Sequence, residues 1–264
     1  VDNSTGNFSI SFTDLAGNPG ITVIGPTVPI TIDTQAPELL AVSIESDNLD
    51  NQTARLNDRV TLTLRASESI ERPEVFLHGD NITVQSTDGV NWSADYLVTS
   101  QSHQGLVSLD IYFEDHAGNA GTRTNSTNDN SSVEIDTIDP LISNVAIGST
   151  NDNSSWAKFG DNVTLSFDTS EVIQFPTDTV TIDGLTNVVV RRNASWTGWT
   201  ATGQVASDAS GMANYSISVK DNAGNVATPV TSTVSINLDT DSPFLSRINL
   251  VSNNANDPDA FAKP

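Results

Sequence analysis

Short stretches in which apolar and polar residues alternate recur along the whole chain. Val60, Leu62 and Leu64 alternate with threonine, and residues 163–167 repeat the pattern. The same alternation occupies residues 8–12, 92–96, 107–113, 199–201 and 215–219. A period of two gives a strand one buried face, whereas helix-forming residues are nowhere concentrated at a period of 3.6. The pattern predicts an all-β protein built from short antiparallel strands.

The chain repeats itself. Three prolines, each closing an Asp-Thr-x-x-Pro sequence, follow one another at intervals of 103 residues: Pro37, Pro140 and Pro243. A second marker, Asp-x-Ala-Gly-Asn, occupies residues 14–18, 115–119 and 221–225. A third, Asp-x-Val-Thr-Leu, begins at Asp58 and at Asp161. Three markers in one order and near one period indicate a tandem array.

The markers divide the chain into two complete repeats and two partial ones. The complete repeats cover residues 34–136 and 137–239. Residues 1–33 hold the last two strands of a preceding repeat, and residues 240–264 hold the first strand and loop of a following one. We therefore expect the chain to be a segment of a longer array.

About seven short strands in a repeat of roughly 100 residues are typical of a two-sheet sandwich of immunoglobulin type. The chain has no cysteine, so the disulfide of antibody domains is absent. The predicted architecture is a linear array of tandem immunoglobulin-like β-sandwiches.

These motifs resemble a known family. The Asp-Thr-x-x-Pro linker, the Val-Thr-Leu strand, the Ser-Glu pairs at 67–68 and 170–171 and the Asp-x-Ala-Gly-Asn turn are similar to bacterial-type immunoglobulin-like tandem repeats. Such repeats form adhesin stalks, surface layers and filaments of large extracellular surface proteins. The resemblance implies an extracellular location at the cell surface and a role in adhesion.

Charge and composition narrow the function classes. The 33 acidic side chains outnumber the 11 basic ones and give a formal charge of −22, which excludes a basic groove for nucleic acid. No apolar run approaches the ~20 residues of a membrane-spanning helix, so we expect no membrane insertion. The absence of cysteine also excludes thiolate metal sites and a cysteine nucleophile.

The topology of a sandwich predicts a metal site. The N-terminal linker, the loop after the second strand (B–C) and the turn before the last strand (F–G) lie at one end of such a fold. In the first repeat this gathers Asp33, Glu68, Asp115 and Asn119. In the second it gathers Asp136, Asp139, Asp168, Glu171, Asp221 and Asn225, with Asp47 and Asp50 approaching from the A–B loop of the repeat before. Converging carboxylates repel one another unless a cation lies between them, and Ca²⁺ prefers six to eight oxygen ligands.

The sequence therefore predicts structural calcium at the domain junctions, and the resemblance agrees, since related arrays are commonly stiffened in this way. The alternative stays open for each aspartate. Asp at the start of an Asp-x-Ala-Gly-Asn turn accepts backbone N–H bonds without a metal, while Gly adopts positive φ. Residues 128–130 and 151–153, each Asn-Asp-Asn, are interpreted as solvated loops because they lack the central glycine and closing glutamate of a helix–loop–helix calcium loop.

No constellation for catalysis stands out. His78, His103 and His116 fall in different loops, and no Gly-x-Ser-x-Gly sequence occurs. We expect a non-enzymatic protein. Trp199 aligns with Trp92 and is expected in the core, whereas Trp196 has no counterpart and is the aromatic side chain to consider for sugar binding.

Three functions remain in order of preference. The first is a calcium-stiffened stalk whose partners are neighbouring repeats of the same chain. The second is a subunit segment of a self-assembling surface layer or filament, which binds other copies of itself. The third is a carbohydrate-binding module with a groove around Trp196. Eleven Asn-x-Ser/Thr sequences make glycosylation possible in a secretory pathway that performs it.

Overall fold

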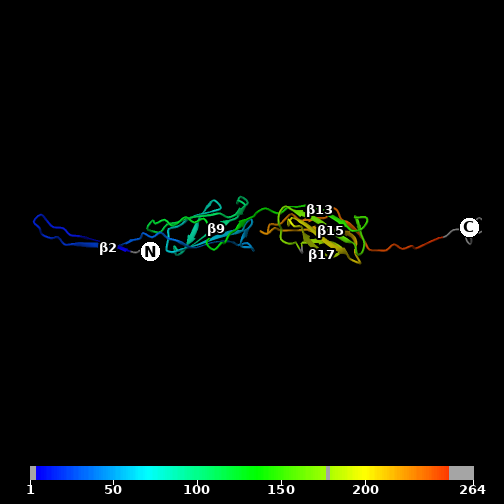
Figure 1. Ribbon diagram of the computed structural model, residues 1–264, viewed down its shortest axis with the longest axis horizontal. Helices are drawn as coiled ribbons and strands as arrows, with labels where there is room; N and C mark the ends of the chain where they lie inside the picture. The colour runs from blue at the N-terminus through cyan, green and yellow to red at the C-terminus, as the bar shows by residue number, and fades with distance from the viewer. Residues whose placement is uncertain (1–3, 177–178, 250–264) are drawn as a thin grey trace, which may run out of the picture. The chain divides into compact units, whose positions relative to one another are not determined.

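The computed structural model describes residues 4–176 and 179–249. Within these ranges the ordered elements are strands, and no helix is long and apolar enough to cross a membrane. The predicted all-β class is confirmed. The strands form two immunoglobulin-like sandwiches. Figure 1 labels strand β9 in the first sandwich and strands β13, β15 and β17 in the second.

The chain divides into two compact units. The first comprises residues 1–141 together with the loop segments 171–174 and 219–228. The second comprises residues 142–170, 175–218 and 229–264. Two loops of the second repeat, residues 171–174 and 219–228, are thus assigned to the first unit. This division does not follow the repeats, so the repeat boundaries at residues 136 and 239 stay predictions.

The first sandwich has a four-stranded sheet facing two smaller ones. The large sheet has the order β3-β5-β9-β8, with bounds Leu39–Ser46, Arg59–Ala66, Asn91–Leu97 and Val84–Ser86. A second sheet has the order β11-β6-β7, with bounds Leu109–Tyr112, Glu74–Leu77 and Asp80–Ile82. A third has the order β10-β12-β4, with bounds Gly105–Leu106, Glu134–Ile135 and Thr53–Ala54. The pair β12–β4 is parallel, and the other pairs are antiparallel.

The core of this sandwich follows the sequence alternation. Val60, Leu62 and Leu64 of β5 are buried, and the intervening Thr61 and Thr63 are not. The facing sheets contribute Val75, Leu77, Leu109, Ile111 and Ile135, and Val133 directly before β12 is buried with them. Burial of these side chains, at roughly 25 cal/mol per Å² of apolar surface, is the main force that holds the two layers together.

The second sandwich repeats this plan, with differences in one facing sheet and at the edge of the large sheet. Its large sheet has the order β13-β15-β18-β17, with bounds Ile142–Ser149, Asn162–Thr169, Gly198–Val205 and Leu185–Arg192. The facing sheets are β16-β20-β21, with bounds Val180–Ile182, Tyr215–Ile217 and Val230–Thr231, and β14-β22-β19, with bounds Trp156–Ala157, Ile236–Asp239 and Ser210–Ala213. The edge strand β17 has eight residues, whereas its counterpart β8 has three.

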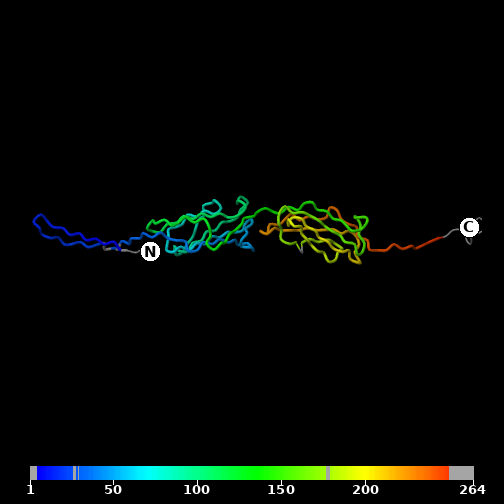
Figure 2. Tube along the Cα trace, viewed as in Figure 1, coloured from blue at the N-terminus to red at the C-terminus, as the bar shows by residue number. Residues whose placement is uncertain are grey.

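The N-terminal strands form a hairpin. β1 (Ser4–Ile10) pairs antiparallel with β2 (Val23–Ile32), and Figure 2 traces the two strands in blue. Phe8, Ile10 and Phe12, which the alternation predicts to face inward, are 47%, 53% and 56% exposed. A two-stranded sheet has no facing layer among the described residues, so the apolar side chains of this partial repeat stay uncovered. The first strand predicted in residues 240–264 is not present in residues 240–249, and residues 250–264 lie outside the described residues.

Candidate functional site

The Asp-x-Ala-Gly-Asn turn is held by its own first residue. Asp115 Oδ1 accepts hydrogen bonds from the backbone N–H groups of Ala117 at 2.8 Å and Asn119 at 2.9 Å. Gly118 has φ +84°, a left-handed conformation that glycine adopts without steric cost. The turn therefore forms from local chemistry alone, as one of the two interpretations of these aspartates predicts.

In both complete repeats the last residue of the Asp-x-Ala-Gly-Asn turn donates a hydrogen bond to the linker. Asn119 Nδ2 donates to Asp115 Oδ2 at 2.7 Å and to the backbone carbonyl of Asp33 at 3.2 Å. Asn225 Nδ2 donates in the same way to Asp221 Oδ2 at 2.8 Å and to the carbonyl of Asp136 at 2.9 Å. These asparagines attach the F–G turn to the linker through neutral hydrogen bonds.

Three carboxylates converge beside each attachment. Asp33, Glu68 and Asp115 each place one oxygen within 4.8 Å of the others, and Asp136, Glu171 and Asp221 do the same. Asp115 and Asp221 are only 3% and 1% exposed, while the other four are half-buried. We call these two sets the first and second carboxylate groups. Both lie within the first compact unit.

Burial and mutual repulsion perturb these groups. Partial burial, followed by the negative charges of Asp136 and Asp221, raises the pKa of Glu171 above its ordinary value. Burial also opposes ionisation of Asp115, but hydrogen bonds from Asn119, Ala117 and Gly118 outweigh it and lower the pKa of Asp115. Asp115 thus stays ionised at neutral pH in a place where desolvation is unfavourable.

The geometry suits a hard divalent cation. Carboxylate oxygens bind Ca²⁺ at about 2.3–2.6 Å, and one oxygen from each carboxylate of a group lies within 4.8 Å of the others, so each group could hold such a cation. The first group borders an open hollow of about 450 Å³, lined by Thr31, Asp33, Glu68, Ser69, Asp115, His116 and Ala117. Three carboxylate ligands leave further coordination positions for carbonyl oxygens or water.

The other predicted ligands belong to neither group. Asp47 Oδ1 accepts the backbone N–H of Arg59 at 2.7 Å, and Asp50 Oδ1 accepts that of Gln52 at 3.1 Å. Asp168 Oδ2 accepts Asn144 Nδ2 at 2.8 Å, and Asp139 is exposed. The first three are thus engaged in hydrogen bonds to nearby strands and turns, and the structure does not bring these four together with Asp136, Glu171 and Asp221.

The A–B loop does approach the turn at 221–225, but through other residues. Asn48 Nδ2 donates to the carbonyl of Ala223 at 2.9 Å, and Arg55 Nη1 donates to the carbonyl of Gly224. All of these residues lie in the first compact unit. The sequence did not predict these hydrogen bonds from an amide and a guanidinium to backbone carbonyls, because only carboxylates were considered as candidates in the A–B loop.

The sequence argument also missed a contact of His116. Its Nδ1 lies 2.7 Å from Glu71 Oε1 and its Nε2 lies 3.2 Å from Ser69 Oγ, which joins the B–C loop to the F–G turn. Glu71 precedes His116 by 45 positions and Ser69 precedes it by 47, so no local sequence motif could reveal these contacts. Val172, Gln174 and Asn222 stand at these positions in the second repeat.

Comparisons with known proteins support no closer assignment than the fold. No protein-family model matches the chain, and no curated protein matches it. A tandem of titin Ig domains is 11% identical with a TM-score of 0.27, over 78% of this chain and 98% of that one.

Two other solved structures are similar in the same degree. The N-terminal eight Ig domains of Down Syndrome Cell Adhesion Molecule are 12% identical with a TM-score of 0.38, over 90% of this chain and 28% of that one. Fibronectin(III)-like modules of Clostridium thermocellum CbhA are 15% identical with a TM-score of 0.35, over 75% and 94%. Because these TM-scores are low, the immunoglobulin-like assignment depends on the strand order of the chain itself.

Proposed function

We propose that this chain is a non-enzymatic structural segment of an extracellular cell-surface protein, a stalk of tandem immunoglobulin-like sandwiches that calcium stiffens at the linkers and that supports adhesion. The observation that carries the proposal is the recurrence of the carboxylate group. Asp33, Glu68 and Asp115 occur again as Asp136, Glu171 and Asp221 at equivalent places in the fold.

Electrostatics supports a cation at these places. Each group has three acids with oxygens within 4.8 Å of one another, and one of the three is almost fully buried. In the second group, repulsion contributes to the raised pKa of Glu171. A divalent cation bound between the carboxylates would attract all three of them. This attraction would also offset the free energy that the carboxylates lose when burial removes their water.

The location supports a role in stiffening. One ligand of each group comes from the linker, one from the B–C loop and one from the F–G turn. A shared cation would therefore fix the linker to two loops at once, beyond the single hydrogen bond that Asn119 or Asn225 provides. The proline that follows in each Asp-Thr-x-x-Pro sequence further restricts the backbone of the linker.

Calcium titration by isothermal calorimetry tests the binding step. We expect Glu68→Gln and Glu171→Gln each to remove one site, because each substitution deletes one carboxylate of one group. Glu134→Gln is the matched control, since Glu134 is exposed and belongs to neither group. Unchanged stoichiometry and affinity in both variants would overturn the calcium assignment.

Small-angle scattering with calcium and with chelator tests the stalk. A maximum dimension that is fixed with calcium and broadly distributed in chelator is the expected result. No change on chelation would contradict calcium stiffening. A mass that rises with concentration would instead favour the self-assembling layer or filament.

A further inference from the structure

Two tryptophans occupy the same place in the two sandwiches but have different surroundings. Trp92 pairs with Leu64 across β9 and β5, and Trp199 pairs with Phe167 across β18 and β15. Trp199 is 2% exposed, whereas Trp92 is only half-buried. Trp92 also borders an open hollow of about 840 Å³, which we call the Trp92 hollow.

One aromatic residue accounts for the difference. In the second sandwich the ring of Phe175 meets Trp199 edge-on, with 5.6 Å between centroids. The B–C loops correspond residue by residue, since Ile70 bridges to Asp115 and Ile173 bridges to Asp221. Arg72 therefore stands where the second repeat has Phe175, and it lines the Trp92 hollow. A flexible, exposed guanidinium replaces the ring that would cover the indole.

Hydrogen bonds hold the walls of the Trp92 hollow. His116 connects Ser69 and Glu71 on one side. On the other, Asp88 Oδ1 accepts the backbone N–H groups of Val90 at 2.9 Å and Asn91 at 2.7 Å. The indole itself is oriented, because Trp92 Nε1 donates to the carbonyl of Gly89 at 3.0 Å. A hollow with fixed walls binds a ligand at a smaller entropic cost.

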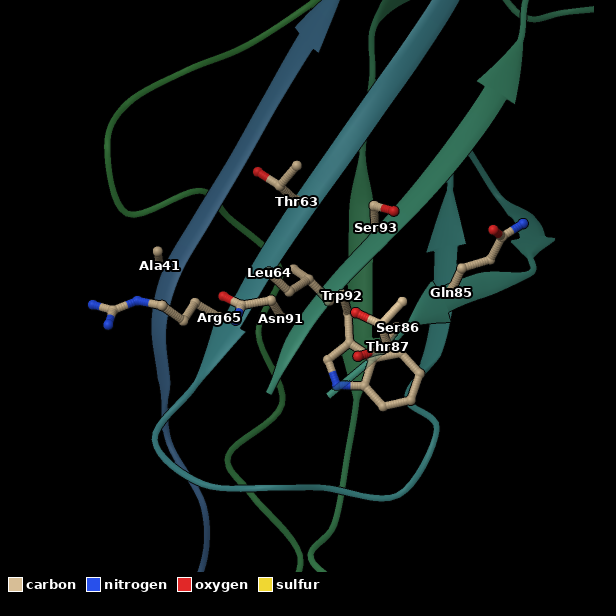
Figure 3. A pocket seen from close by; sticks show the side chains of 10 residues that line it. All are labelled: Ala41, Thr63, Leu64, Arg65, Gln85, Ser86, Thr87, Asn91, Trp92 and Ser93. Atoms are coloured by element: carbon tan, nitrogen blue, oxygen red, sulfur yellow. The ribbon is translucent and has the colours of Figure 1, made fainter. Parts of the chain in front are cut away.

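Several polar side chains around the hollow are uncommitted. Arg72, Thr83, Gln85 and Thr87 line it, are exposed, and have no side-chain hydrogen bond to any described residue. Together they offer guanidinium and amide donors, an amide oxygen acceptor and two hydroxyls. Figure 3 shows the indole of Trp92 beside Ser86 and Thr87, with Gln85 on the neighbouring strand.

The polar surface continues beyond this hollow. An adjoining hollow of about 530 Å³ shares Gln85, Ser86, Thr87 and Trp92, and is the one drawn in Figure 3. A third, of about 450 Å³, shares Thr83 and Gln85 and extends to Asn81 and Asp95. Gln85 pairs with the exposed Ser93 and follows the buried Val84, so its side chain and these two hollows lie on the outer face of the sheet, whereas the Trp92 indole lies on the inner face.

We propose that the first sandwich binds a neutral oligosaccharide in the Trp92 hollow, with Trp92 as the stacking surface and Arg72 and Thr87 as hydrogen-bonding groups. A sugar ring has one face of C–H groups that packs on an indole and a rim of hydroxyls that needs donors and acceptors. The formal charge of −22 opposes anionic ligands. The exposed polar lining does not suit a lipid chain.

The structure moves this function away from Trp196, which the sequence favoured. Trp196 is 44% exposed, but the guanidinium of Arg192 lies over its ring. None of the hollows around Gln85 includes it. The alternation places Trp92 on an inward face and Trp199 aligns with it, and only the packing separates the two.

The test uses the full chain and four neutral probes: cellohexaose, mannohexaose, chitohexaose and maltohexaose. Binding is followed by the ¹H–¹⁵N signal of the Trp92 indole, identified with Trp92→Phe. We expect at least one probe to shift this signal in a saturable way. Thr87→Ala should weaken binding by up to about tenfold, the effect of losing one good hydrogen bond. Arg72→Phe should abolish binding by covering the indole as Phe175 covers Trp199.

Matched controls separate binding from folding. Arg191→Ala removes an exposed arginine of the second sandwich and should leave probe affinity unchanged. Thr87 and Arg72 are exposed, so both variants should unfold as the wild type does. Failure of all four probes to shift the Trp92 signal overturns the proposal, as does a shift that Thr87→Ala and Arg72→Phe leave intact. Tighter binding of a heparin hexasaccharide than of any neutral probe would overturn the assignment to neutral sugars.

Discussion

The side-chain amide of Asn225 donates a 2.9 Å hydrogen bond to the backbone carbonyl of Asp136, 89 positions earlier in the chain. Asn119 makes the same bond to Asp33 at 3.2 Å. In each repeat the residue that closes the F–G turn thus holds the linker in place. The carboxylate groups lie beside these attachments, which need no cation for their hydrogen bonds.

Asn225→Ala should destabilise the protein by about 1–3 kcal/mol, because it leaves buried acceptors at Asp221 and Asp136 without their donor. Asn119→Ala should cost less, since Asn119 is more exposed and its bond to the linker is longer. Urea denaturation of both variants in chelator measures the difference. If both variants lost the same free energy of unfolding, burial of the asparagine side chain would not explain the size of the effect.

Glu171→Gln should increase the free energy of unfolding in chelator at pH 7. The folded-state pKa of Glu171 is raised, so its contribution is fully present below the unfolded value near 4.5 and is lost as pH rises through the folded pKa. The neutral amide removes that loss. Denaturation curves from pH 4 to pH 7 should show a smaller decline for the variant than for the wild type.

The same substitution should reduce the stabilisation that calcium gives. Removing one carboxylate weakens the proposed site, and a ligand at free concentration c stabilises the folded state by RT ln(1 + c/Kd), which falls as Kd rises. The shift of the melting temperature on adding calcium measures this effect, with Glu134→Gln as control. An undiminished shift in Glu171→Gln would show that calcium acts elsewhere.

Asp161→Asn should destabilise the second sandwich by roughly 1 kcal/mol at pH 7. The Lys158 side chain and backbone N–H, with Asn151, lower the pKa of Asp161 to about 2. This contribution is present above the unfolded pKa near 3.8 and is lost as pH falls through about 2. The difference between variant and wild type should therefore shrink between pH 4 and pH 2 in urea melts.

Leu62→Ala should cost about 2–5 kcal/mol, because Leu62 is fully buried between the sheets of the first sandwich. Ile10→Ala should change the free energy of unfolding by less than about 0.5 kcal/mol, since Ile10 is 53% exposed on the N-terminal hairpin. Thermal unfolding monitored by circular dichroism compares the two. A large effect of Ile10→Ala would mean that another surface covers the hairpin in solution.

Much of the candidate site could be predicted from the chain alone. The topology of a sandwich places the linker, the B–C loop and the F–G turn at one end, so Asp33, Glu68 and Asp115 could be grouped before any coordinates. Asp47 and Asp50 could not be excluded in this way. Their carboxylates are used by backbone N–H groups one turn or one strand away, and loop geometry decides that competition.

The sequence by itself determined the strands and their repetition, because a period of two and a 103-residue spacing are properties of residue order. Tertiary structure decided which aligned residues share an environment. Trp92 and Trp199 align, yet one borders a hollow and the other is covered, because Arg72 replaces Phe175 at a neighbouring loop position. Exposure depends on every side chain packed around a residue, and contacts between distant loops set it.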